Sequence, residues 1–177
     1  MYHYISGYTA KVAGTEMGVS EPQATFSACF GAAFLVWHPA KYAEILAENM
    51  KKYGSKAWLV NTGWSGGEYG IGKRLSIKHT RAIIDGIHSG ELASSKKEID
   101  PIFGLAMLTV CAGVPNEILN PRNLWQDKTE YDNLAMYLAG LFKQNFAKFE
   151  KDSSEAISKA GSLKFEDLSK KGGKLKD

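Results

Sequence analysis

Residues 60–74 read VNTGWSGGEYGIGKR, and this stretch decides how the chain around it is interpreted. The short apolar segment Ala57–Val60 runs into it, and a pattern typical of a helix follows from Ser76 to about Ser89. A strand, a glycine-rich loop and a helix in this order are typical of α/β proteins. The stretch therefore predicts an α/β fold in which Ala57–Val60 is a strand covered on both faces.

Two active-site motifs overlap within this stretch. Gly63–Gly67 fits the G-x-S-x-G pattern of a hydrolase, with Ser65 as nucleophile, and Gly67–Lys73 fits the phosphate-binding pattern G-x-x-x-x-G-K. The hydrolase pattern requires a helix directly after the serine, but glycines follow Ser65. The phosphate loop requires Ser or Thr next, to bind Mg²⁺, and Arg74 occupies that position. Pattern alone leaves three interpretations open: a hydrolase, contact with a nucleotide, or a plain glycine-rich turn with two solvated cations.

Composition limits the classes of protein further. A length of 177 residues favours one domain, and 44% hydrophobic with 23% charged residues is ordinary for a globular protein. The longest apolar stretch, Phe26–Trp37, is shorter than the roughly 18 residues that cross a bilayer, so we expect buried core there and no membrane partner. The net charge of +3 is accounted for by residues 159–177, and the balanced remainder argues against a nucleic-acid partner.

Neither the cysteines nor the histidines form a recognisable site. The two cysteines, Cys29 and Cys111, make no disulfide framework, which favours reduced thiols and a cytoplasmic protein. The histidines show no spacing typical of metal ligands, and we therefore expect no metal site. They are His3, His38, His79 and His88.

The remaining periodicity predicts two helices and a strand. One helix begins at His38–Pro39, since proline is tolerated at the first helical position, and ends at Gly54. The D-x-x-E pattern of Asp127–Glu130 predicts the start of the longest helix, whose apolar stripe continues to Phe149. Between these helices, the apolar run Ile102–Val110 predicts a further strand.

Four stretches of the sequence go beyond short motifs. They are MYHYISGYTAKVAGTE at 1–16, EPQATFSACFGAAF at 21–34, LVNTGWSGGEYGIGKRLSIKHTRAIIDGIHSG at 59–90 and the GVPNEILNPRNLW region at 113–125. On these stretches the sequence resembles ATP-dependent phosphoenolpyruvate carboxykinase, over the C-terminal third or so of that enzyme. The resemblance implies a C-terminal mononucleotide-binding lobe with a mixed sheet flanked by helices. Residues 1–150 would form this incomplete domain, followed by a weakly ordered Lys-, Ser- and Gly-rich tail over 151–177.

The resemblance also implies a set of ATP-binding residues. They are Arg74 and Leu75, just after the glycine-rich loop, and Thr80 in the next helix. A guanidinium pairs with phosphate or ribose oxygens or stacks on a base, Leu offers an apolar surface and a backbone group, and a Thr hydroxyl hydrogen-bonds an adenine edge. Thr9–Pro22 resembles the mobile lid of this superfamily, and Met17 stands where relatives have Arg or Asp, so we expect no direct catalytic role for it.

The implied reaction converts oxaloacetate and ATP to phosphoenolpyruvate, CO2 and ADP in gluconeogenesis, with Mg²⁺ and Mn²⁺ as cofactors. In this family the phosphate loop, the metal ligands and the oxaloacetate-binding residues come earlier in the parent sequence, so no catalytic or metal-binding residue is assigned here. The expected partners are ATP, oxaloacetate or phosphoenolpyruvate, and the rest of the parent enzyme. The chain alone is expected to be inactive. The alternative is a non-catalytic nucleotide-binding or structural fragment.

Overall fold

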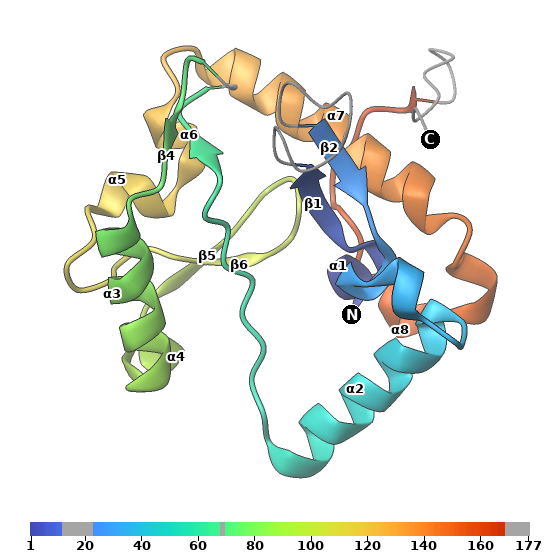
Figure 1. Ribbon diagram of the computed structural model, residues 1–177. Coiled ribbons are helices and arrows are strands. Elements are labelled where there is room, and N and C mark those ends of the chain that lie inside the picture. Colours follow the sequence, from blue (N-terminus) through green and yellow to red (C-terminus); the bar gives the residue numbers. More distant parts are fainter. Residues whose placement is uncertain (12–22, 68–69, 169–177) are drawn as a thin grey trace. The chain divides into compact units, whose positions relative to one another are not determined.

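The computed structural model describes residues 1–11, 23–67 and 70–168 (Figure 1). The chain divides into two compact units, Met1–Trp58 with Met136–Asp177, and Leu59–Ala135. Helices alternate with short strands in both units, which confirms the α/β class. The described strands form three two-stranded antiparallel sheets instead of the expected mixed sheet, because each strand is two to four residues long and pairs only with its hairpin partner.

The first unit is built from both ends of its sequence. Its elements are α1 (Tyr2–Ser6), β1 (Tyr8–Lys11), β2 (Gln23–Phe26), η1 (Ala28–Phe30), η2 (Ala32–Phe34), α2 (Pro39–Tyr53), the second part of α7 (Lys128–Phe146), η3 (Glu150–Asp152) and α8 (Glu155–Ser158).

Aromatic side chains form the core of the first unit. The β1–β2 hairpin places Tyr8 opposite Phe26, and both rings lie against Phe142 of α7, with ring centroids 5.4 and 5.2 Å from it. Tyr2 of α1 packs on Phe146 with a centroid separation of 4.3 Å. Aromatic pairs at these separations contribute beyond their buried area. The hairpin, α1 and α7 therefore form one packed body.

Helix α2 has the boundaries that its sequence predicts. His38 is the N-cap, its Nδ1 accepting a hydrogen bond from the Ala40 N–H at 3.4 Å, and Pro39 occupies the first turn. The helix ends at Gly54, whose φ of 65° lies in the left-handed region that favours glycine. Both predicted ends are confirmed.

The second unit lies within one continuous stretch. Its elements are β3 (Trp64–Ser65), β4 (Lys73–Arg74), α3 (Ile77–His88), α4 (Glu91–Ser94), β5 (Lys97–Ile99), β6 (Ala106–Leu108), α5 (Asn116–Leu119), α6 (Pro121–Leu124) and the first part of α7. The core of this unit includes Leu92, Ile102, Cys111 and Val114.

The strand expected over Ile102–Val110 is shorter in the structure. The buried carboxylate of Asp100 accepts hydrogen bonds from the N–H groups of Ile102 and Phe103 at 2.8 and 2.6 Å, which folds the chain into a tight turn. Strand β6 begins only after this turn and pairs with β5, a strand that the sequence did not predict.

Helix α7 begins where the D-x-x-E pattern predicts. Oδ1 of Asp127 accepts hydrogen bonds from the N–H groups of Thr129 and Glu130, at 2.7 and 3.2 Å. These bonds satisfy two of the free donors at the start of a helix. The helix ends at Phe146, short of the predicted Phe149, and its first part belongs to the second unit while the remainder belongs to the first.

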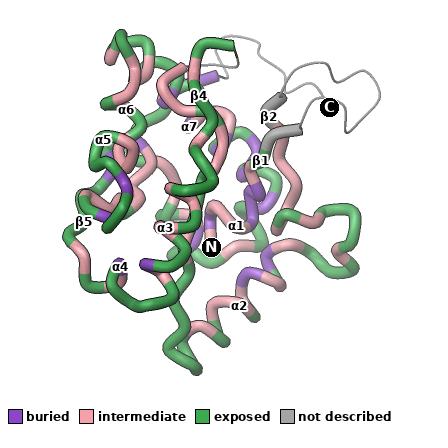
Figure 2. The backbone as a smooth tube through the Cα atoms, turned by 60° about the vertical axis from the view of Figure 1, so that its left-hand side comes forward, coloured by how far each residue is buried: buried purple, intermediate pink, exposed green. Residues whose placement is uncertain are grey.

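Two apolar runs are not buried as the sequence predicts. Within Phe26–Trp37, Phe34 and Val36 are each 87% exposed, and the backbone forms two 3₁₀ turns. Residues 57–60 form no strand, and Leu59 is 60% exposed. Figure 2 shows exposed and half-buried backbone through both segments. An apolar run is buried only where other residues cover it, and the described residues cover neither run.

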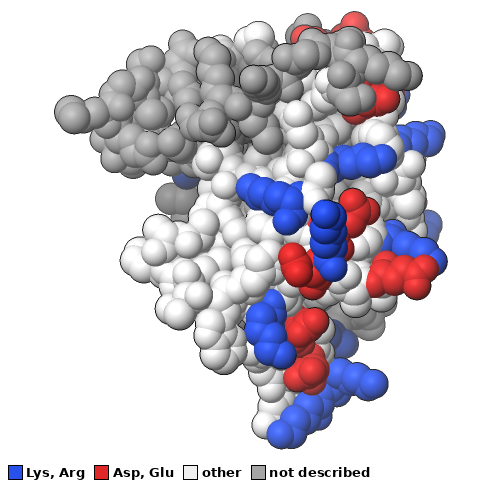
Figure 3. All heavy atoms as spheres, turned by 90° about the vertical axis from the view of Figure 1, so that its right-hand side faces the viewer, with Lys and Arg blue, Asp and Glu red and all other residues white. Residues whose placement is uncertain are grey.

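In the view of Figure 3, charged side chains of both signs gather on part of the surface and leave a broad uncharged area beside them. Across the described ranges, none of the helices combines the length and apolar character that a bilayer crossing demands.

The predicted division of the chain at residue 150 stays a prediction. The 3₁₀ turn η3, Glu150–Asp152, crosses this division, α8 follows it, Ile157 and Leu168 are buried, and residues 169–177 lie outside the described residues.

Candidate functional site

A tight hairpin closes the glycine-rich loop in the second unit. Strand β3 pairs antiparallel with β4, so that Trp64 lies opposite Arg74, and the Leu75 N–H donates to the Gly63 carbonyl at 3.1 Å. The loop is thus held at both ends by backbone hydrogen bonds. Residues 68 and 69 at its tip lie outside the described residues.

Two glycines of this loop are required by close backbone approaches. Gly66 has a φ of 81°, and a Cβ there would come within 3.1 Å of the Leu124 carbonyl oxygen of α6. A Cβ at Gly72 would come within 2.8 Å of the Ser65 carbonyl oxygen. A side chain at Gly72 would overlap the backbone, and one at Gly66 would be strained by the positive φ and would crowd the Leu124 carbonyl. The loop therefore packs tightly on itself and on the end of α6.

Helix α3 begins directly after the hairpin. Ser76 is its N-cap, with Oγ accepting from the His79 N–H at 3.2 Å. The Thr80 hydroxyl donates to the Ser76 carbonyl at 3.1 Å, which leaves its oxygen as an acceptor. The N-terminus of a helix carries a partial positive charge that favours anions. Two cations, Lys73 and Arg74, lie exposed just before it.

The predicted ATP-binding residues lie in the segment that runs from the end of β4 to the first turn of α3. Arg74 is exposed at the end of β4, Leu75 is half-buried between hairpin and helix, and Thr80 is half-buried in the first turn of α3. The Leu75 N–H is already bonded to Gly63, so only its carbonyl and side chain remain available. The expected lid, Thr9–Pro22, lies outside the described residues from position 12 onward, as does Met17.

The geometry fits neither of the two short motifs. A hydrolase nucleophile lies on a sharp turn between strand and helix, whereas Ser65 lies within β3 and pairs with Lys73. In a phosphate loop the lysine opens the helix, whereas Lys73 lies in β4 and the helix begins at Ile77. Both matches are coincidences of spacing.

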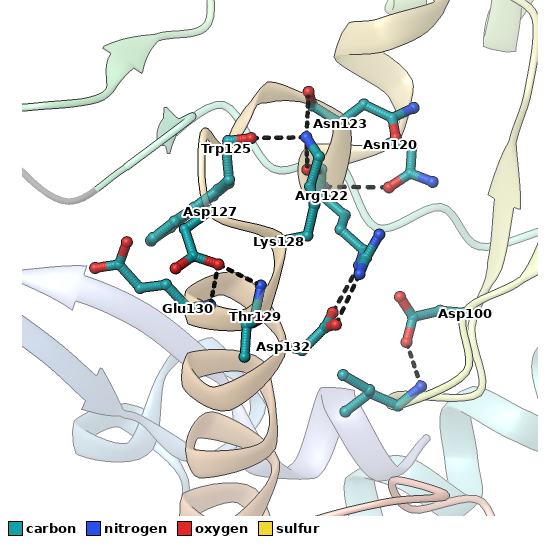
Figure 4. Close-up of polar contacts among 11 residues, drawn as sticks. Asp100, Asn120, Arg122, Asn123, Trp125, Asp127, Lys128, Thr129, Glu130 and Asp132 are labelled. Carbon is teal, nitrogen blue, oxygen red and sulfur yellow. Dashed lines mark hydrogen bonds and ion pairs between the residues drawn. The ribbon is translucent and has the colours of Figure 1, made fainter.

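A cluster of polar side chains supports the segment on which the loop packs (Figure 4). The Lys128 ammonium donates to three backbone carbonyls, those of Arg122, Asn123 and Trp125, at 2.9, 2.9 and 2.6 Å. These residues flank Leu124, the residue that Gly66 approaches. Lys128 thereby fixes the turn between α6 and α7 against which the glycine-rich loop lies.

A second contact, between α6 and α7, holds the same turn. The Arg122 guanidinium forms a two-fold hydrogen-bonded ion pair with Asp132 of α7, with N–O distances of 2.7 and 2.9 Å (Figure 4). This pair raises the pKa of Arg122, chiefly through its hydrogen bonds. Burial, with smaller contributions from the carboxylates of Asp100 and Asp132, raises the pKa of the neighbouring Tyr131. The sequence did not predict this cluster, because its members are separated by irregular turns.

The second unit also contains a cavity of about 320 Å³ that is separate from the predicted binding residues. Its lining includes Asp85, Ser89, Glu91 and Cys111. Burial and the nearby Glu91 raise the pKa of the Cys111 thiol, which favours its protonated form. Cys29 and Cys111 are both free thiols. Across the described residues, no three side chains of His, Cys, Asp or Glu gather into a metal-binding group.

The features so far define an α/β protein with a glycine-rich hairpin that leads into a helix N-terminus. Residues 1–117 match the family described as phosphoenolpyruvate carboxykinase, and the chain belongs to this ATP-dependent family.

Curated relatives support this assignment over most of the chain. The chain is 59% identical to "Phosphoenolpyruvate carboxykinase (ATP) 2" of Salinibacter ruber, over 91% of this chain and 30% of that relative. It is 60% identical to "Phosphoenolpyruvate carboxykinase (ATP)" of Zea mays, over 84% of this chain and 22% of the relative. For the Dictyostelium discoideum protein of the same description the identity is 53%, over 92% and 29%. The chain thus spans less than a third of these relatives' length.

Proposed function

We propose that this chain forms the ATP-contacting part of an ATP-dependent phosphoenolpyruvate carboxykinase, which converts oxaloacetate and ATP to phosphoenolpyruvate, CO2 and ADP in gluconeogenesis. The observation that carries the proposal is 59% identity to the Salinibacter ruber relative over 91% of the chain. The chain spans 30% of that relative, so we assign the complete activity to this chain together with the remaining part of such an enzyme. We place the protein in the cytoplasm.

In this proposal residues 1–150 form an incomplete mononucleotide-binding lobe, and 151–177 form a weakly ordered tail. Strands from the remaining polypeptide would complete a mixed sheet in which Ala57–Val60 is an inner strand. The exposed apolar side chains of Leu59 and Val60, 60% and 37% exposed, support this role. An exposed, continuous apolar segment is typical of a strand that lacks its neighbours.

Each predicted binding residue has a chemical role. The exposed Arg74 guanidinium and the N-terminus of α3 together attract an anion, which suits the nucleotide phosphates. Thr80 donates its only hydroxyl proton to Ser76, so its oxygen accepts a hydrogen bond from a base amino group. Leu75 offers apolar surface beside them. The lid over Thr9–Pro22 would exclude water from the enolate formed on decarboxylation.

Bound Mg²⁺ and Mn²⁺ would neutralise charge on the transferring phosphoryl group. Lys73 and Arg74 are cations, so they suit the nucleotide phosphates and not the metal ions. We assign the metal ligands, like the oxaloacetate-binding residues, to the polypeptide outside this chain.

Titration of a full-length carboxykinase that contains this chain with a fluorescent ATP analogue tests the proposed contacts. Arg74→Ala should weaken binding by about 1–3 kcal/mol, because one charge-assisted contact is lost. Thr80→Val should weaken it less, since a single neutral hydrogen bond is removed. Arg81→Ala is the matched control, because it removes the same exposed charge further along α3. An unchanged dissociation constant for Arg74→Ala would contradict the assignment.

The alternative is a non-catalytic nucleotide-binding or structural fragment, which the coverage of less than a third of the relatives' length favours. The assay combines the chain alone with oxaloacetate, ATP and Mn²⁺. We expect no turnover. Turnover comparable to that of a complete enzyme would show that the chain does not need the remaining polypeptide.

A further inference from the structure

We propose that Arg122 and Asp132 form a positioning pair for the nucleotide: their ion pair sets where the glycine-rich hairpin, and with it Arg74, is held for contact with ATP. The inference rests on the proposed function, because it requires Arg74 to contact the nucleotide. Every residue in the argument lies in the second unit, Leu59–Ala135.

The glycine-rich hairpin rests on the last residue of α6. Gly66 directly follows β3, and a Cβ there would lie 3.1 Å from the carbonyl oxygen and 3.4 Å from the Cβ of Leu124. Because the two backbones are so close, Leu124 cannot move toward the hairpin unless Gly66 moves with it. The position of α6 therefore limits the position of the hairpin.

The hairpin passes such a displacement on to Arg74. Trp64 lies opposite Arg74 in the β3–β4 pair, and the Leu75 N–H donates to the Gly63 carbonyl at 3.1 Å. Among the described strands, β3 and β4 pair only with each other. No larger sheet of described strands holds them, so contacts with other elements, such as the one with α6, decide where Arg74 lies.

Arg122 and Asp132 hold α6 on α7. Nε and Nη2 of Arg122 donate to the two carboxylate oxygens of Asp132 at 2.7 and 2.9 Å (Figure 4). Two parallel bonds fix the orientation of both side chains as well as their separation. Arg122 lies two residues before Leu124 in a helix of four residues. A helix this short has little stability of its own, so its contact with α7 decides how it is oriented.

The ion pair should matter more for geometry than for stability. The side chains of Arg122 and Asp132 are 43% and 37% exposed, and ion pairs open to solvent stabilise a fold little. Binding of ATP depends on geometry, because a displaced cation makes a poorer contact with a phosphate. Loss of the pair should therefore change ATP binding more than it changes the stability of the fold. This difference distinguishes a positioning role from a structural one.

The test uses a full-length carboxykinase that contains this chain. Arg122→Met should raise the KM for ATP several-fold, leave the KM for oxaloacetate unchanged and lower the Tm by no more than a few degrees. Arg122→Lys keeps the charge but not the two-fold geometry, so it should recover only part of the ATP affinity. Lys159→Met is the matched control, because it removes an exposed ion pair with Glu155 in the first unit, and it should change neither KM.

Two double variants test the route from the ion pair to the nucleotide. Arg122→Met combined with Asp132→Leu should bind ATP no more weakly than Arg122→Met alone, because the two side chains act as one unit. Arg122→Met combined with Arg74→Ala should bind ATP no more weakly than Arg74→Ala alone, since the pair acts through Arg74. Additive losses of affinity in either double variant refute the proposal.

The remaining outcomes separate this proposal from the proposed function. If Arg122→Met does not fold, Asp132→Asn replaces it, because asparagine keeps the size of the side chain and one acceptor oxygen. An unchanged KM for ATP refutes the positioning role, and so does an equal rise of both KM values with a large fall in Tm. If Arg74→Ala weakens ATP binding and the loss of the ion pair does not, the positioning pair is refuted and the proposed function stands. Unchanged ATP binding in Arg74→Ala refutes the proposed contact and this inference with it.

Discussion

Replacement of Lys128 by Met tests whether this side chain fixes the turn between α6 and α7. Its ammonium donates to three carbonyls at 2.6–2.9 Å, and the side chain is half-buried. A hydrogen bond to a charged group contributes roughly 1.5–3 kcal/mol, but water replaces part of this at exposed carbonyls such as that of Asn123. The substitution keeps the apolar stem, so we expect a loss of about 2–3 kcal/mol in unfolding free energy.

The second unit contains a matched control. The Lys97 ammonium also donates to backbone carbonyls, those of Ala93 and Ser95, at 2.9 and 3.2 Å, but Lys97 is exposed. Lys97→Met should therefore cost less than about 1 kcal/mol. Urea unfolding followed by tryptophan fluorescence measures both losses, and Trp125 lies beside the Lys128 contact.

The reasoning also predicts an effect on the glycine-rich loop. Because Gly66 packs against Leu124, Lys128→Met should weaken binding of the fluorescent ATP analogue, and Lys97→Met should not. Equal losses of stability in the two variants, or no loss in Lys128→Met, would refute the claim that the three carbonyl contacts hold this turn.

Two further predictions concern the first unit. Gly7→Ala should lower the free energy of unfolding by more than about 3 kcal/mol, because the new Cβ would overlap the Ser27 carbonyl. Gly54→Ala is the control: it has a similar φ but open space around it, and should cost about 1 kcal/mol. Similar losses for the two variants in urea unfolding would contradict the close approach at Gly7. Burial, with a smaller contribution from Glu150, raises the pKa of Tyr2 to about 12 from 10.0, so the folded state keeps the phenol protonated where the unfolded state loses the proton. Unfolding free energy should therefore fall as pH rises from 10 to 12, and Tyr2→Phe should reduce that fall; an unchanged slope would show that Tyr2 does not contribute.

Local sequence signals predicted the three long helices, α2, α3 and α7, because their causes are local, and missed the helices of four or five residues. Proline and glycine fix the ends of α2, and an N-cap side chain starts α3 and α7. Each of these signals acts over a few residues, so one sequence is enough to recognise it. The hairpin around the glycine-rich loop was not predicted, since its strands are only two residues long.

Burial was predicted poorly, because it depends on residues distant in sequence. The apolar runs at Phe26–Trp37 and Ala57–Val60 predicted core, but the described residues cover neither. The same reason explains why the cluster around Lys128 was missed: three carbonyls converge on one ammonium only after two short helices have folded. For the predicted binding residues Arg74, Leu75 and Thr80, whose role stays a prediction, the structure adds that the Leu75 N–H and the Thr80 hydroxyl proton are already bonded.

The β1–β2 hairpin has a consequence for protein engineering. Its four paired positions run from Tyr8 opposite Phe26 to Lys11 opposite Gln23, and the Ser27 N–H donates to the Gly7 carbonyl at 3.0 Å. These contacts join the two strands into one unit of packing. A segment exchanged between homologues should therefore carry both strands of the hairpin together, so that Tyr8 and Phe26 keep their register and their contact with Phe142.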